Sequence, residues 1–62
     1  MGKMIEFTTV NNGTIAIDMD AIVSVEDTGD GCLIKYEAGT NKETAFVKDG
    51  YRDVIHKVSH GD

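Results

Sequence analysis

The stretch Ala21–Glu37, with the sequence AIVSVEDTGDGCLIKYE, sets two apolar runs on either side of a short polar segment. Both runs are rich in β-branched and aromatic residues, which fit a pleated, half-buried strand. The segment between them, 26–31, holds two glycines and three acidic residues. Gly29 and Gly31 supply the positive φ that a tight reversal needs, and the neighbouring aspartates can bond their own backbone. The stretch therefore predicts a β-hairpin at the centre of the chain.

Apolar and polar residues alternate in five segments, and each of these segments predicts a strand. The expected strands are Met4–Val10, Thr14–Asp18, Ala21–Val25, Cys32–Tyr36 and Glu43–Lys48. Two further turns, Asn11–Gly13 and Ala38–Asn41, are expected because asparagine and glycine tolerate the left-handed region of backbone space.

The last segment has the apolar period of one helix face, which predicts a C-terminal α-helix over 49–60. The apolar residues are Tyr51, Val54, Ile55 and Val58. Asp49 is expected to cap the first turn and Gly61 to end the helix. Asp53 and Lys57, four positions apart, predict an ion pair on the polar side. A helix this short is marginal alone, so we expect it to dock on the sheet.

These elements predict a mainly β (α+β) fold: a five-stranded antiparallel meander or small open barrel with one C-terminal α-helix. The 62 residues are expected to form one small domain, with residues 1–3 as an unstructured or non-native extension before a natural start at Met4. A single cysteine, Cys32, excludes an intrachain disulfide and a zinc spacing. Because a core of this size supplies about 3–5 kcal/mol, a homo-oligomer is expected, with a dimer as its simplest form.

The charge pattern bears on the class of partner. The net charge is −5 and the six basic residues are scattered along the chain. This composition disfavours nucleic-acid binding, since phosphates attract clustered positive charge. The sequence also lacks an apolar stretch of the length that a signal peptide or membrane span requires, so membrane insertion is not expected. The expected location is cytoplasmic, with a reduced thiol.

Three strings of residues carry a family resemblance. They are MI-x-F-T-x-V-N-N-G from Met4, I-x-I-D-x-D-x-I-x-x-V-E-D-T-x-D from Ile15, and G-x-x-K-x-x-x-F-V-K-x-G-Y-x-x-V-I from Gly39. The pattern resembles the small flagellar FlbD-like (swarming-motility) proteins, and is similar to small phage and mobile-element proteins of uncharacterised role. The matching positions are Met4, Ile5, Thr8, Asn11, Ile17, Asp20, Ile22, Val25, Glu26, Asp30, Ile34, Gly39, Lys42, Val47, Lys48, Val54 and Ile55. The resemblance implies a non-enzymatic cytoplasmic accessory protein associated with motility, and it transfers no catalytic or ligand residue.

Two groups of residues have the composition of a metal site. The first has the spacing of an EF-hand loop, and its members are Glu26, Thr28, Asp30, Gly31 and Glu37. Because its flanks are predicted strands rather than helices, we favour a solvated hairpin tip. The second, Asp53, His56 and His60, shares a predicted helix face on which zinc or nickel could bind adventitiously. We therefore predict no functional metal site and no cofactor.

Cys32 is the remaining candidate for chemistry. A cysteine nucleophile needs a nearby base and a lowered pKa. Cys32 instead has the strand parity of Ile34 and Tyr36, which favours a small buried hydrophobic residue. No catalytic residue is therefore predicted, and the chain is not expected to be an enzyme.

Strand parity also predicts a contact surface. The expected core consists of the helix stripe and Ile5, Phe7, Ile15, Ile17, Val25, Ile34, Tyr36 and Val47. Leu33 and Phe46 have the opposite parity to the core residues of their strands, and we expect Val23, Leu33 and Phe46 to lie on the other face of the sheet. Large apolar residues on an exposed face usually mark an interface. The alternative is that a bulge near Ile22, or curling into a barrel, buries them.

Two classes of function stay open from the sequence. The first is a protein-interaction module that binds itself or another protein, as a motility, phage or mobile-element accessory protein. The second is an RNA-binding small β-barrel of the Sm-like sort, for which the strand count fits and the charge does not.

Overall fold

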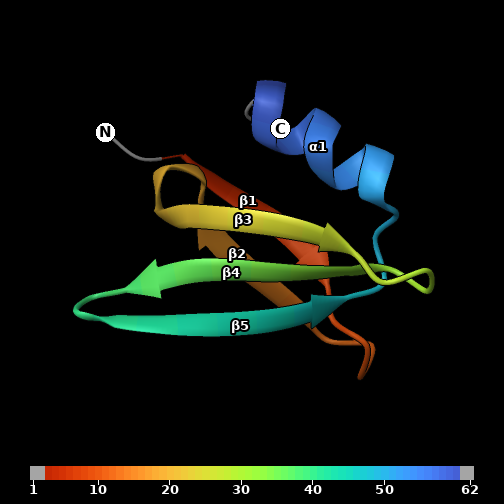
Figure 1. Ribbon diagram of the computed structural model, residues 1–62, viewed down its shortest axis with the longest axis horizontal. Helices are drawn as coiled ribbons and strands as arrows, with labels where there is room; N and C mark the ends of the chain where they lie inside the picture. The colour runs from red at the N-terminus through yellow and green to blue at the C-terminus, as the bar shows by residue number, and fades with distance from the viewer. Residues whose placement is uncertain (1–2, 61–62) are drawn as a thin grey trace.

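The computed structural model describes residues 3–60. Their elements are β1 (Met4–Thr8), β2 (Thr14–Asp18), the 3₁₀ turn η1 (Met19–Ala21), β3 (Ile22–Asp27), β4 (Cys32–Ala38), β5 (Asn41–Val47) and α1 (Tyr51–His60). The strands form two antiparallel sheets, β1-β2 and β3-β4-β5, and α1 lies over one side of them (Figure 1). This confirms the predicted mainly β fold with a C-terminal helix. The meander is divided at η1, and the described strands do not close into a barrel.

Most differences from the expected boundaries lie at turns. β1 ends at Thr8 rather than Val10, because Thr9 leaves the β1–β2 ladder and bridges to Val47 of β5. β5 begins at Asn41, two residues earlier than expected, because the preceding turn is tight and Gly39 takes φ +66°. The helix begins at Tyr51 rather than 49.

The two ends of the chain bear on two further predictions. Gly61, the expected end of the helix, lies outside the described residues, as do positions 1–2 of the expected extension. Lys3 belongs to the fold, because its carbonyl accepts a hydrogen bond of 2.8 Å from the Met19 N–H.

The core lies between the two sheets and under the helix. β1, β2, β4 and β5 each contribute residues of one parity, as alternation requires, whereas β3 contributes Ile22 and Val25 on either side of a register shift. The buried members are Ile5, Phe7, Ile17, Cys32, Ile34, Ala45, Val47 and Val54. Ile15, Met19, Ile22, Val25, Tyr36 and Val58 are partly buried against them. Eight buried hydrophobic residues make a small core, so the loss of any one of them removes a large share of the stabilisation.

The two sheets meet at one corner, where the end of β1 lies beside the end of β5. The Lys48 N–H donates to the Thr8 carbonyl at 2.7 Å, and the Val10 N–H donates to the Phe46 carbonyl at 3.2 Å. The Lys48 ammonium also donates to the Asn12 side chain in the β1–β2 turn. Beyond this corner the sheets diverge, and the chain leaves β5 to enter α1 (Figure 1).

The glycines of the central hairpin have different roles. Gly29 has φ +92° and its N–H donates to the Asp27 carboxylate, as the turn chemistry predicts. Gly31 does not have positive φ, so that part of the prediction is wrong. Its need for glycine is spatial instead, because a Cβ at this position would lie 2.0 Å from the Val47 carbonyl oxygen.

The helix docks through half of its predicted stripe. Val54 is 0% exposed and Val58 packs against the core. Ile55 is half-buried, whereas Tyr51 is 41% exposed and lies at the margin of the contact. The predicted docking is therefore correct, and the prediction that Tyr51 belongs to the core is wrong.

Candidate functional site

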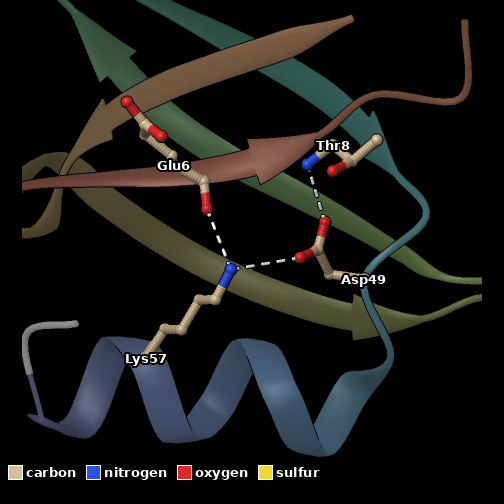
Figure 2. A network of polar contacts seen from close by, with 4 residues as sticks. All are labelled: Glu6, Thr8, Asp49 and Lys57. Carbon is tan, nitrogen blue, oxygen red and sulfur yellow. Dashed lines mark hydrogen bonds and ion pairs between the residues drawn. The ribbon is translucent and has the colours of Figure 1, made fainter. Parts of the chain in front are cut away.

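The edge of β1 that faces away from β2 is closed by two polar side chains (Figure 2). The Thr8 N–H donates to Asp49 Oδ1 at 2.8 Å, and the Lys57 ammonium donates to the Glu6 carbonyl at 3.0 Å. Lys57 Nζ also lies 3.2 Å from Asp49 Oδ2. The backbone of Glu6 and Thr8 and the side chains of Asp49 and Lys57 therefore form one network. An exposed strand edge can pair with another chain, and this network occupies two of the groups that would do so, the Thr8 N–H and the Glu6 carbonyl.

The network corrects two predictions about the helix. Asp49 does not cap α1, because its carboxylate bonds Thr8 and Lys57, while the Val54 N–H donates to the Gly50 carbonyl. Within residues 3–60, Lys57 pairs with Asp49 rather than with Asp53. Lys57 Nζ also lies 5.4 Å from the centre of the Phe7 ring, a cation–π distance. The last turns of the helix are therefore anchored to the first strand.

The structure brings together two of the three predicted contact residues. Leu33 of β4 lies directly opposite Phe46 of β5, on the face of the sheet that points away from the core. Phe46 is 56% exposed and Leu33 is half-buried beside it. Val10 is also exposed and its N–H bonds the Phe46 carbonyl, so it lies at the same end of the sheet. Val10 was missed because the sequence predicted it inside β1.

Val23 lies apart from this pair. The β3–β4 register shifts between Ile22 and Ser24, so Val23 is the extra residue of a β-bulge. The bulge turns Ile22 toward the core and leaves Val23 53% exposed. A bulge near Ile22 is therefore present as the alternative supposed, yet it does not bury Val23. The role of Val23, Leu33 and Phe46 as partner contacts stays a prediction.

We call the face of β3-β4-β5 that points away from the core the outer face. The ladder registers place on it Ser24, Glu26, Leu33, Lys35, Glu37, Lys42, Thr44 and Phe46. Seven of them are exposed and Leu33 is half-buried. Two glutamates and two lysines cancel here, so the net charge of −5 belongs to the rest of the chain.

The residues with the spacing of an EF-hand loop are spread along the β3–β4 hairpin. Glu26 lies opposite Leu33, whereas Glu37 lies opposite Lys42 near the far end of β4. Leu33 and Glu37 are four positions apart, and this separation corresponds to about 13 Å along a strand. Oxygen ligands of one calcium ion lie about 2.5 Å from it, so these two carboxylates do not share an ion.

The histidines lie together on the exposed side of α1. The rings of His56 and His60 are 4.3 Å apart between centroids and tilted by 40°. Residues 3–60 contain no group of three His, Cys, Asp or Glu side chains arranged to hold a metal ion.

Two hollows open to solvent beside the start of α1. The first separates the β3–β4 turn from the helix, and its lining includes Asp27, Asp30, Lys48 and Arg52. Both signs of charge line it, so it favours no anion or cation. The second runs along the helix and is lined by Tyr51, Arg52, Ile55, His56, Ser59 and His60.

Cys32 is buried at the start of β4, as its parity predicts. Burial raises the pKa of the Cys32 thiol, and the negative charges of Asp27 and Asp49 raise it further. A raised pKa leaves the thiol protonated and unreactive at neutral pH. The environment is that of a structural cysteine rather than a nucleophile.

This shift predicts a loss of stability in alkali. The unfolded thiol ionises first, so above its pKa of about 8.5 the unfolded state binds fewer protons and stability falls with rising pH. We expect the Tm of the parent to fall more steeply between pH 8 and 10 than the Tm of Cys32→Ala. Thermal melts at several pH values measure the two slopes. Equal slopes would show that ionisation of Cys32 does not contribute to the loss of stability in alkali.

No helix within residues 3–60 has the length and apolar character needed to cross a membrane. Comparison with known proteins finds no match to this chain among protein-family models, curated proteins or solved structures.

Proposed function

We propose that this chain is a non-catalytic protein-interaction module of the FlbD-like kind, which associates with a second copy of itself through the outer face. The observation that carries the proposal is the Leu33–Phe46 pair, in which a large aromatic side chain is 56% exposed beside a half-buried leucine. Aromatic residues in partly desolvated surroundings commonly supply most of the binding energy of an interface. The family resemblance makes a cytoplasmic role in motility the expected context, with a phage or mobile element as the alternative.

The charge of the outer face favours a second copy as the partner. Two molecules that each carry −5 repel one another over most of their surface. The outer face is neutral in sum, and its glutamates and lysines can pair with the opposite charges of a second copy. It is therefore the described sheet face on which self-association meets little repulsion. The same balance gives RNA no basic surface to bind, so the Sm-like alternative gains no support here.

Phe46→Ser is expected to weaken self-association while the domain stays folded. Phe46 lies outside the core, and truncation of a central aromatic contact typically costs about 2 kcal/mol or more, which is about 30-fold in Kd. Sedimentation equilibrium across micromolar concentrations measures the mass, and circular dichroism checks the fold. The concentration dependence of Tm should weaken as this contact is lost.

Thr44→Ser is the matched control, because it changes a polar residue of the same strand and face. It should leave the mass unchanged. The proposal fails if the parent is monomeric across this range, or if Phe46→Ser unfolds a monomer, since Phe46 would then belong to the core.

A further inference from the structure

The two edges of the β1-β2 sheet differ in whether their backbone groups have hydrogen-bond partners. Asp49, Lys48 and Lys57 bond the backbone groups along the outer edge of β1. β2 has β1 as its neighbour on one side and no strand on the other within residues 3–60. Figure 1 draws β2 behind β4, with its free edge turned away from the helix that covers β1.

The ladder register shows which groups lie on the free edge of β2. The Thr9 N–H donates to the Gly13 carbonyl at 2.9 Å and the Met19 N–H to the Lys3 carbonyl at 2.8 Å. Bonded pairs alternate along an antiparallel ladder, so Ile15 and Ile17 exchange the bonds with β1. The N–H and C=O groups of Thr14, Ala16 and Asp18 therefore point away from β1.

Several of the usual protections of a strand edge are missing from β2, a five-residue strand whose one charged residue, Asp18, is at its end. Natural edges carry proline, lysine, a bulge or an inward-pointing charge, or are covered by another element. The chain has no proline, and the segment TIAID has no lysine. The β1–β2 register is regular, and Thr14 and Ala16 are exposed. The edge of β3, by contrast, carries the bulge at Val23 and contacts α1.

We propose that β2 pairs antiparallel with β2 of a second copy, across a two-fold axis at Ala16, to form a continuous four-stranded sheet. The outward groups of Thr14 and Asp18 lie symmetrically about Ala16, as a two-fold contact between identical strands requires; the Asp18 carbonyl, which as the N-cap of η1 accepts the first bond of that turn, has a second lone pair for the contact. Ala16 would exchange both hydrogen bonds with Ala16 of the second copy, and Thr14 with Asp18 at each end. The pattern of free groups on one strand is thus its own complement.

The side chains fit this register. Ile15 is half-buried in one copy and would lie opposite Ile17 of the other, which covers its exposed part. Each Asp18 would face a threonine, and the two Asp18 residues lie at opposite ends of the ladder, about 13 Å apart along the strand. The Asp18 carboxylate also already accepts a hydrogen bond of 2.9 Å from the Asp20 N–H. No like charges are therefore brought together.

This contact is separate from the outer face and does not depend on it. One chain with two different self-complementary surfaces forms assemblies larger than a dimer, either closed or open-ended. The two contacts can therefore be removed one at a time.

Residue-resolved hydrogen exchange tests the pairing in the parent protein. The Ala16 N–H should exchange at least 10-fold more slowly at high micromolar concentration than at high dilution. The Ile15 and Ile17 N–H groups, bonded to β1, should change less and serve as internal references. An Ala16 N–H that exchanges at the same fast rate at both concentrations would refute the pairing.

Ala16→Pro gives an independent test, since proline removes the outward N–H without removing a β1–β2 ladder bond. Ala16→Val is its control, because valine keeps the N–H and suits a strand. Sedimentation should show a smaller mass for Ala16→Pro than for Ala16→Val, with circular dichroism showing both folded. If Ala16→Pro unfolds, the exchange experiment decides alone.

Combination with Phe46→Ser separates the two proposals. Each single variant should form a dimer through its remaining contact, and the double variant should be monomeric. If Phe46→Ser is a monomer and Ala16→Pro keeps the parent mass, the β2 pairing is wrong and the outer face stands. If Ala16→Pro is a monomer and Phe46→Ser keeps the parent mass, the outer face is wrong and the pairing stands.

Discussion

Val54→Asp is expected to leave the chain unfolded at 25 °C. Val54 is the fully buried residue of α1, at 0% exposure, and it packs among core residues of both sheets. An unpaired carboxylate at such a position costs several kcal/mol, either by desolvation of the charge or by its neutralisation. A core of this size supplies about 3–5 kcal/mol in total, so the single change removes most of the stability. Far-ultraviolet circular dichroism and thermal melting measure the loss.

Ser59→Asp provides the matched control, because it adds the same charge to an exposed position of the same helix. Changes of this kind alter stability by about 0.5 kcal/mol or less. A Val54→Asp protein that melts within a few degrees of the parent would show that the helix does not dock.

Gly31→Ala is expected to have the second-largest effect, through one added methyl group. The new Cβ would lie 2.0 Å from the Val47 carbonyl oxygen and 3.1 Å from the Lys48 Cα. Both contacts are with backbone, so relief of the clash requires movement of Val47 and Lys48, whose backbone pairs with the end of β1. Overpacking that shifts backbone typically costs about 1–3 kcal/mol and sometimes more. Chemical denaturation of the parent and variant measures the difference.

Gly29→Ala separates this steric explanation from a backbone one. Gly29 has φ +92° and open space around its Cβ position, so alanine there meets strain alone, at about 1–2 kcal/mol. Gly31→Ala should therefore be the more damaging of the two. The steric account is wrong if Gly29→Ala destabilises the protein more.

Local signals were sufficient for the elements whose bonds are also local. β2 has the bounds that alternation predicts, and the Asp27 carboxylate accepts from Gly29 as turn chemistry requires. Asn12 likewise takes φ +68° in the first turn. In each case the groups that determine the conformation lie within a few residues of one another, so the sequence displays them together.

The roles of Asp49 and Lys57 could not be read from the sequence. Asp49 bonds a residue 41 positions away and Lys57 a residue 51 positions away. Helical spacing suggested a cap and an i, i+4 pair, each worth a few tenths of a kcal/mol to about 1 kcal/mol. The edge of β1 presents backbone groups that both side chains can bond while they also pair with each other, and these bonds form in place of the local ones.

Of the three predicted contact residues, two could be placed from the sequence and one could not. Leu33 and Phe46 lie on one face because the β4–β5 ladder is regular, which is the condition that parity counting assumes. Val23 lies in a bulge, where one extra residue changes the parity of everything before it. No residue type marks that insertion in the sequence, so its place required the structure.

The bond between Lys57 and the Glu6 carbonyl has a consequence for the synthesis of the protein. A ribosome adds Lys57 51 residues after Glu6, so the first strand is made well before the residue that bonds it. Until Asp49 has emerged the Thr8 N–H lacks its partner, and until Lys57 has emerged the Glu6 carbonyl lacks its partner. A nascent chain that ends before Lys48 therefore has none of these partners for β1, and both edges of its first sheet can pair with a neighbouring chain on the same messenger.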